Sequence, residues 1–386
     1  MKTLDQVFEQ TIRKARTPKG GIVPLFKVFM PSTIQKPLVT TLFSGYIGQG
    51  PKVEIFEQKL GRLIKNPYVV TVNTGTSGLH LAYHLCIDKS EAEIITTPMT
   101  CAATNIPILN TKQAKIVWAD INPKTGLIDP HDIKRKITKR TRAIVMVHWG
   151  GNPAEIDEIN KLAREYKIKT IEDAAHGFGT RYQGKMLGEK TSDFVIYSFQ
   201  AIKNINTVDG GVLVCKSKTD YQRAKLLRWY GIDRESKQVG DFRCEKDIVE
   251  AGYKFHMNDV SATIGLEMLP YLPLVIGRHR ENSLYYQNHL KCESVLESKQ
   301  ARSSCWLHTV LLPKRKRDAF IEYMLENKIQ VSKVHVRNDI HSVFKKFRVS
   351  LPGVDEFNNR HCCLPVGWWV SRAELKKITK LVNQFL

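Results

Sequence analysis

Lys203 lies in a polar connection between two short apolar runs that are rich in β-forming residues. The runs are DFVIYSF (193–199) and GGVLVC (210–215), and the connection ends in the turn-forming Asp209-Gly210-Gly211. An amine held between buried strands is partly removed from water, which disfavours its charged form. A neutral amine can attack a carbonyl carbon and form a Schiff base. An ordinary surface lysine could lie in the same local sequence, so other parts of the chain must show whether Lys203 is a catalytic amine.

A carboxylate follows a second apolar run, where Asp173 ends IKTIED (168–173) and precedes Ala174, Ala175 and His176. An acid at the end of a buried strand is costly to bury unless it meets a cation. Asp173 therefore either caps the next segment or pairs with a protonated ring nitrogen.

A turn rich in small and hydroxyl residues joins a strand to an apolar helix in PYVVTVNTGTSGLHLAYHLC (67–86). Free backbone amides and the helix dipole make such a helix N-terminus an anion site. A plain turn with Ser or Thr as the N-cap would explain the same residues.

Strands alternate with helices along the first part of the chain, which predicts an α/β domain with a mostly parallel sheet. The expected elements after residue 90 are a strand and helix start (93–109), two strands (115–122 and 142–151), a helix (155–167) and a strand (168–175). Ligands of such sheets gather beyond the carboxyl ends of the strands. We expect an N-terminal arm (1–36), a large α/β domain (37–248) and a smaller C-terminal α+β domain (249–386).

The amine, the carboxylate and the anion-binding turn are together what pyridoxal phosphate needs. The cofactor requires an amine for its aldehyde, an anion for its pyridinium nitrogen and a phosphate anchor. A ring nitrogen that stays protonated beside a carboxylate is the better electron sink.

Six segments of the chain resemble the DegT/DnrJ/EryC1/StrS family of sugar aminotransferases, from about residue 40 to the end. They are SGYIGQGPKVEIFE (44–57), NTGTSGLHLA (73–82), TRAIVMVHWGGNPAEIDEI (141–159), IEDAAHGFG (171–179), SFQAIKNINTVDGGVL (198–213) and GYKFHMNDVSATIGL (252–266). The resemblance implies the fold type I architecture of the aspartate aminotransferase superfamily, with pyridoxal phosphate as cofactor. It also implies a homodimer whose subunits share their active sites.

The resemblance assigns roles to residues whose motifs match. Lys203 matches the Schiff-base lysine, and Asp173 matches the acid that pairs with the pyridine nitrogen. His176 matches the position beside the ring. The expected phosphate contacts are Thr76, Ser77 and Ser198.

The chain departs from the family pattern at two positions. Lys254 stands where asparagine is usual in the segment that reaches the phosphate of the neighbouring subunit. Cys101, in the run TCAAT (100–104), stands where the family places an aromatic ring over the cofactor, so another aromatic residue is expected to stack there. Lys203 is kept, whereas the dehydratases of this family have histidine, and this favours transamination.

The family implies transfer of an amino group from an amino acid, with L-glutamate expected, to a nucleotide-linked 4-keto-6-deoxyhexose. VHVRNDIHSVF (334–344) resembles the segment that lines the sugar pocket, and Arg337 and His341 are the candidate contacts, although both could be ordinary surface residues. The alternatives are a transaminase for another oxidised sugar, such as an octulosonate, and a regulator that binds the cofactor without turnover.

Composition narrows the remaining classes of protein. The 386 residues are 42% hydrophobic and carry a formal net charge of +21. Such a charge attracts nucleic acid, anionic membranes or anionic substrates, but no aromatic residues interleave with the basic runs 134–140 and 314–317. The eight cysteines show no metal-ligand spacing, and the N-terminus lacks a signal peptide's apolar core. We therefore expect a cytoplasmic enzyme without a metal, acting on small molecules rather than on nucleic acid or a membrane.

Overall fold

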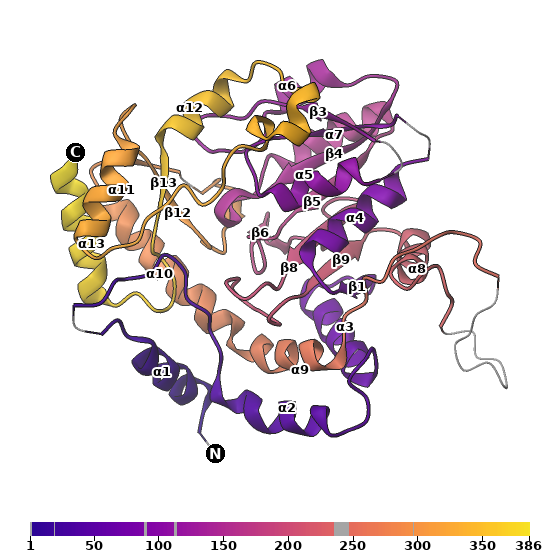
Figure 1. The fold of residues 1–386 in the computed structure, drawn as a ribbon, viewed down its shortest axis with the longest axis horizontal. Coiled ribbons are helices and arrows are strands. Elements are labelled where there is room, and N and C mark those ends of the chain that lie inside the picture. Colours follow the sequence, from indigo (N-terminus) through magenta and orange to yellow (C-terminus); the bar gives the residue numbers. More distant parts are fainter. Residues whose placement is uncertain (1, 19, 89–90, 112–113, 235–246, 296) are drawn as a thin grey trace.

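The computed structural model describes residues 1–386 except 1, 19, 89–90, 112–113, 235–246 and 296. Its centre is a seven-stranded sheet with the order β1-β9-β8-β5-β4-β2-β3 (Figure 1). The strands are β1 (Val69–Val72), β2 (Glu93–Thr96), β3 (Lys115–Trp118), β4 (Thr141–Val147), β5 (Lys169–Asp173), β8 (Phe194–Ser198) and β9 (Gly211–Cys215). β9 runs antiparallel to β1 and β8, and the other pairs are parallel. The expected α/β fold with a mostly parallel sheet is confirmed.

Helices cover both faces of the sheet, because its strands are apolar on both sides. In β8, Ile196 packs into one core cluster while Val195 and Tyr197 pack into the other. One face is covered by α4 (Gly75–Cys86), α5 (Ala102–Leu109) and α8 (Lys218–Leu227). The other is covered by α3 (Pro51–Ile64), α6 (Pro130–Lys136) and α7 (Ile156–Tyr166).

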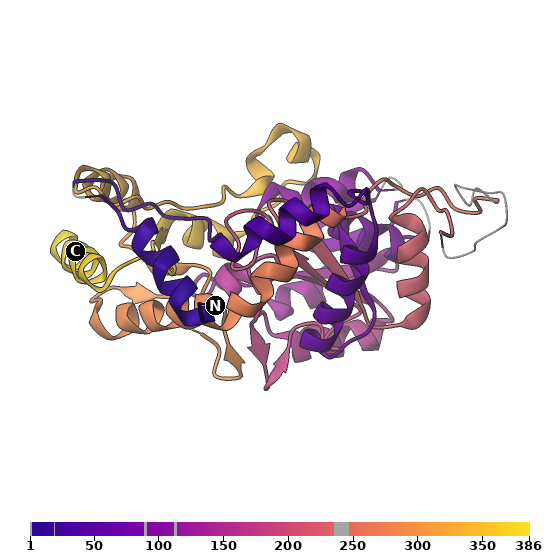
Figure 2. The same ribbon diagram turned by 90° about the horizontal axis from the view of Figure 1, so that it is seen from below.

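A smaller lobe lies at one side of the large sheet, and the C-terminus is on it (Figures 1 and 2). Its strands β10 (Glu293–Ser294), β12 (His308–Leu311) and β13 (His361–Leu364) form an antiparallel sheet. Its helices are α10 (Leu272–His289), α11 (Arg317–Glu326), α12 (Pro352–Arg360) and α13 (Arg372–Phe385). A third small sheet joins β6 (Arg181–Tyr182), β7 (Lys185–Met186) and β11 (Ala301–Arg302). The domain limits at 36 and 248 stay predictions.

The N-terminal part begins with α1 (Leu4–Ala15) and then runs extended against the smaller lobe before α2 (Gln35–Leu42). Val23 forms a β-bridge with Ile329, and the Trp369 indole N–H donates to the Pro24 carbonyl at 3.0 Å. These contacts hold Phe26 at the boundary between the two lobes.

The stretch Asp259–His289, which contains α9 (Asp259–Met268) and α10, is long and apolar enough to cross a membrane by length and composition. Half of its most apolar window is buried inside the protein. α9 packs on α3 and α2, which is the environment of a core helix. Packing inside the protein therefore explains why this stretch is long and apolar.

Candidate active site

A cavity of about 560 Å³ opens at the carboxyl ends of the parallel strands β4, β5 and β8. Asp173 ends β5, Ser198 ends β8, and Lys203 follows β8 on the loop to β9; all three line the cavity. The smaller lobe and the N-terminal part supply the remaining wall, including Trp306, His335 and Phe26. The elements that the sequence placed around one ligand therefore converge.

Asp173 is held in place by two hydrogen bonds. Its Oδ2 accepts from the Thr104 hydroxyl at 2.7 Å, and its Oδ1 accepts from the Ala175 backbone N–H at 3.1 Å. Asp173 as a whole is 5% exposed. A buried carboxylate that faces a cavity with only neutral donors behind it is suited to a cationic ring nitrogen.

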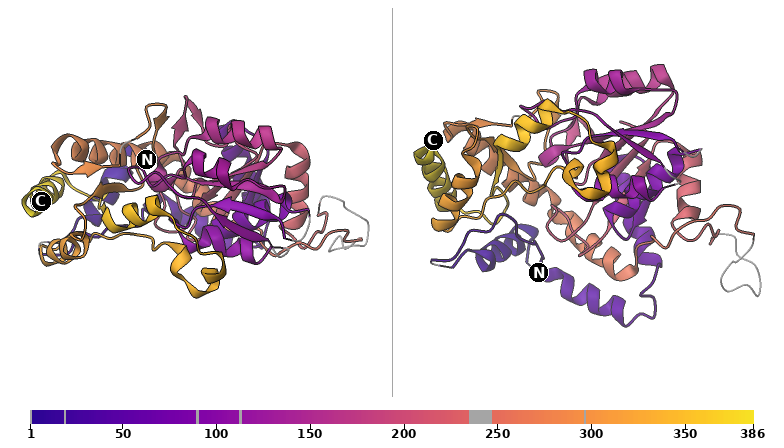
Figure 3. Two further views of the ribbon diagram at one scale, coloured as in Figure 1. Left: turned by 90° about the horizontal axis from the view of Figure 1, so that it is seen from above. Right: turned by 45° about the horizontal axis from the view of Figure 1, so that its top comes forward.

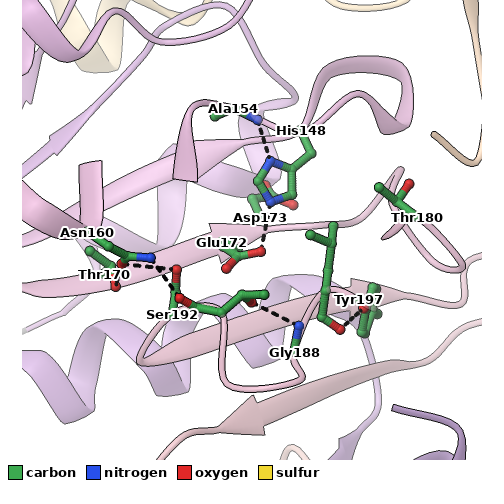
Figure 4. Close-up of polar contacts among 12 residues, drawn as sticks. His148, Ala154, Asn160, Thr170, Glu172, Asp173, Thr180, Gly188, Ser192 and Tyr197 are labelled. Carbon is green, nitrogen blue, oxygen red and sulfur yellow. Dashed lines mark hydrogen bonds and ion pairs between the residues drawn. The ribbon is translucent and has the colours of Figure 1, made fainter. Parts of the chain in front are cut away.

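A second buried pair fixes the strand that carries Asp173 (Figure 4). The His148 Nδ1 accepts from the Ala154 N–H at 3.1 Å, so the ring proton is on Nε2, which lies 3.0 Å from Glu172 Oε2. The His148 backbone N–H also donates to the Asp173 carbonyl at 3.1 Å. Neighbouring residues of a strand point to opposite faces, so Glu172 anchors β5 from the face away from Asp173.

Lys203 is half-buried on a closed loop between antiparallel strands. The Phe199 N–H donates to the Gly210 carbonyl at 2.8 Å, and the Thr207 N–H donates back to the Phe199 carbonyl at 2.8 Å. Burial lowers the pKa of the Lys203 amine to about 7, against the opposing effects of Asp173 and Cys101. The amine that the sequence predicted to be neutral is therefore available as a nucleophile near neutral pH.

The N-terminus of α4 forms another part of the cavity wall. Thr74, Gly75 and Thr76 line it, and no described residue accepts a hydrogen bond from the Gly75 or Thr76 N–H. A Cβ added to Gly75 would lie 3.0 Å from the Ser198 Cβ, so only glycine allows α4 to approach β8 this closely. Free amides at a helix N-terminus beside Ser198 are suited to a phosphate group.

Ser77, the third predicted phosphate contact, points elsewhere. Its N–H donates to the Thr74 hydroxyl at 3.0 Å, and its own hydroxyl donates to Asn73 Oδ1 at 2.6 Å. Ser77 thus stabilises the N-cap, and it is not among the residues that line the cavity. Its direct contact with phosphate stays a prediction.

A stack of aromatic rings forms the wall beside Lys203. Trp306 stacks on His176 with ring centroids 3.9 Å apart and on Phe26 with centroids 4.9 Å apart. His176 stacks in turn on His335 at 5.4 Å. The Lys203 Nζ lies 3.6 Å from the Trp306 ring centroid, and the Trp306 N–H donates to the Ile202 carbonyl at 3.0 Å.

The two histidines of this wall are neutral. Burial, and then the Lys203 charge, lower the His176 pKa well below its ordinary value. The same two causes lower the His335 pKa to about 3. Because His176 Nδ1 accepts from the Gly150 N–H at 3.3 Å, its proton is on Nε2 and points to His335 Nε2, 3.4 Å away.

Of the other site residues that the sequence predicts, one lines the cavity and three do not. Cys101 is half-buried and lines it. Lys254 lies outside, with its Nζ 4.9 Å from the Trp229 ring centroid. Arg337 is paired with Asp339 and Asp355, and neither Arg337 nor His341 lines the cavity. A substrate contact through these two side chains stays a prediction.

The residues that sequence reasoning missed are those that come from distant segments, above all Trp306, His335 and Thr104. Thr104 lies within the TCAAT run around Cys101, and His335 lies within the VHVRNDIHSVF segment. These motifs point to segments of the active site, but they do not show which side chain of each segment faces the cavity. No motif in the sequence points to Trp306.

The cavity fits pyridoxal phosphate on the chemistry of its donors. It offers an amine with a pKa near 7, a buried carboxylate and a helix N-terminus with unused amides, and all three line the same cavity. Among the described residues no group of three or more His, Cys, Asp or Glu is placed to hold a metal ion. Fold and site together define a fold type I pyridoxal phosphate enzyme.

Comparison with known proteins agrees. The profile of the DegT/DnrJ/EryC1/StrS aminotransferase family matches residues 30–383, so the chain belongs to this family. The crystal structure of AtS13 from Actinomadura melliaura is 36% identical, has a TM-score of 0.89, and the match covers 94% of this chain and 99% of that one. The sugar aminotransferase CalS13 from Micromonospora echinospora is 34% identical with a TM-score of 0.89, over 94% and 100% of the two chains. An uncharacterized protein, MJ1066 of Methanocaldococcus jannaschii, is 32% identical over 90% of this chain and 93% of its own.

Proposed function

We propose that this pyridoxal-phosphate-dependent aminotransferase moves an amino group from L-glutamate to a nucleotide-linked keto-sugar, specifically a 4-keto-6-deoxyhexose. The observation that carries the proposal is the meeting of Lys203, Asp173 and the α4 N-terminus at one cavity. The likeness to CalS13, which is described as a sugar aminotransferase, supports a sugar as the acceptor.

Bound pyridoxal phosphate supplies an electron sink for the carbon that loses or gains a proton. Lys203 would hold the cofactor covalently and, once released, move a proton to and from the substrate carbon as a general base and acid. Both roles need an amine whose pKa lies near 7, so that it can lose and regain its proton, and burial gives Lys203 such a pKa. Asp173 would keep the ring nitrogen protonated, while Thr76 and Ser198 would contact the phosphate.

The sugar would lie against the wall made by Trp306, His335 and Phe26. Aromatic faces pack against the apolar C–H faces of a sugar, and a neutral imidazole whose Nε2 accepts from His176 has its proton on Nδ1, where it can donate a hydrogen bond to a sugar hydroxyl. His335 is the polar residue of the 334–344 segment that lines the cavity. We therefore place the sugar contact of this segment at His335.

A second copy of the chain would complete the phosphate site. The described residues that line the cavity include no arginine and no lysine except Lys203, so a phosphate dianion lacks a permanent counter-charge. The surface of α2 and the following loop exposes large apolar side chains, with Phe43 86% and Tyr46 67% exposed. An exposed apolar surface of this kind suits a subunit interface, and Lys254 of a second copy would bring the missing charge.

The formal net charge of +21 suits an anionic, diphosphate-bearing substrate, and a cytoplasmic location stays a prediction. A substrate panel separates the proposed acceptor from an octulosonate or another oxidised sugar. Transfer of the glutamate amino group to any keto-sugar would exclude a regulator without turnover.

The cofactor assignment is tested by visible absorption of the purified protein, followed by borohydride reduction and peptide mapping. The proposal expects the fixed cofactor on Lys203. Label on a different lysine, or none, would refute it. Lys203→Ala should keep the fold and lose turnover, because the residue lies on a loop and not in a strand.

A further inference from the structure

Asn338 is a buried residue of the smaller lobe that binds the large domain behind the active site. Its Nδ2 donates to the Thr100 carbonyl at 2.8 Å, and its backbone N–H donates to the Pro98 carbonyl at 2.8 Å. Its Oδ1 accepts from Asn105 Nδ2 at 2.7 Å. Asn338 is 1% exposed and Asn105 is fully buried. Three bonds from one residue therefore fix the segment between β2 and the first turn of α5.

The same segment supports the carboxylate of Asp173. The Thr104 hydroxyl donates to Asp173 Oδ2 at 2.7 Å and lies 2.8 Å from the Thr100 hydroxyl. The one proton of the Thr104 hydroxyl is used on Asp173, so the Thr100 hydroxyl must donate to Thr104. Asn338 holds the backbone of Thr100, and the Thr100 side chain is linked through the Thr104 hydroxyl to Asp173.

Asn338 is also joined to the wall of the cavity, because His335 lies three residues before it. Segment 334–348 crosses from the smaller lobe onto the large domain (Figure 3). There Phe344 packs edge-on against Trp118 with ring centroids 5.6 Å apart. Any shift of Asn338 would therefore move His335 relative to Asp173.

We propose that Asn338 is a positioning residue that sets the distance between the Asp173 carboxylate and the His335 wall. The identity of the ligand in the cavity rests on the proposed function. The contacts that link Asn338 to Asp173 do not depend on that function. Every hydrogen-bonding group of the Asn338 amide has a partner, and removing that amide leaves several buried groups unpaired. Small displacements of catalytic groups are costly for rate, so the effect should reach both cofactor binding and turnover.

Asn338→Leu removes the polar groups at similar volume, and Asn282→Leu is the matched control. Asn282 is also buried, and its Nδ2 donates to the Val366 and Gly367 carbonyls at 3.0 Å each, away from the cavity. Three quantities are measured: the Kd for pyridoxal phosphate, kcat and KM, and the alkylation rate of Cys101 in cofactor-free protein by mass spectrometry. Cys101 lies next to Thr100 and reports directly on the anchoring of its segment.

Asn338→Leu should raise the cofactor Kd and lower kcat by about tenfold each, and should accelerate Cys101 alkylation. Asn282→Leu should lower only the melting temperature. Equal effects of the two variants on Kd and alkylation would overturn the proposal.

If Asn338→Leu does not fold, Thr100→Val provides the test, because it removes the linking hydroxyl and keeps the carbonyl that Asn338 binds. It should also raise the cofactor Kd, and an unchanged Kd would overturn the proposal. Altered alkylation in an enzyme that turns over no keto-sugar would support Asn338 while refuting the proposed function.

Discussion

The unusual acidity of the Lys203 ammonium leads to a direct chemical prediction. Burial against Trp306 and the cavity wall lowers the pKa of this amine to about 7. An ordinary lysine, with a pKa near 10.4, is neutral in about one molecule in 2,500 at pH 7, whereas half of the Lys203 amines are neutral there. The reactive fraction at pH 7 is thus about a thousandfold larger.

The perturbation is pH itself, applied to cofactor-free protein. A trace of light acetic anhydride labels neutral amines between pH 5.5 and 10, and excess heavy anhydride then labels the rest after unfolding. Mass spectrometry of the Lys203 peptide gives the labelled fraction, which should be half-maximal near pH 7 and fall about tenfold per pH unit below it.

Asp173→Asn sharpens the test, because the Asp173 charge raises the Lys203 pKa against the effect of burial. Removing that charge should move the midpoint below its wild-type value. A wild-type midpoint above pH 9, or an upward shift in Asp173→Asn, would show that the reasoning from burial is wrong.

Three further outcomes follow from the same contacts. Lys203→Met should stabilise cofactor-free protein in urea unfolding by about 4–5 kcal/mol below pH 7, because folding there must bury a charged lysine; the gain should shrink as pH rises from about 7 to the unfolded pKa near 10.4, and a constant difference from pH 6 to 10 would contradict this. His335→Ala should raise the KM for the keto-sugar about tenfold and leave the glutamate KM unchanged, and His289→Ala, which replaces an exposed histidine that does not line the cavity, is the control expected to change neither. Gly211→Ala should cost about 1–3 kcal/mol of stability and weaken cofactor binding, since the new Cβ would lie 2.6 Å from the Gly75 backbone N; a melting temperature and a cofactor Kd equal to wild type would refute this steric account.

The sequence alone determined the sheet and the ends of its strands, because these depend on local patterns. Apolar runs bounded by turn residues predicted β5, β8 and β9, and the alternation of strands and helices predicted a mostly parallel sheet. Carboxyl ends of parallel strands meet at one edge, so the pattern of strands placed Asp173 where ligands gather, whereas Ser198 was expected in the site only from the resemblance to the family.

The tertiary structure alone decided which distant residues complete the site. Trp306 and His335 stack on His176, and Phe26 stacks on Trp306, because the N-terminal part and the smaller lobe pack against the large domain, and no local pattern encodes those contacts. The sequence also did not show which way a side chain points: the Ser77 N–H donates to the N-cap Thr74 and the Ser77 hydroxyl donates to Asn73, while its phosphate contact stays a prediction. Strand periodicity is a property of neighbouring residues, whereas the closing wall of this cavity depends on how the N-terminal part and the smaller lobe pack against the large domain.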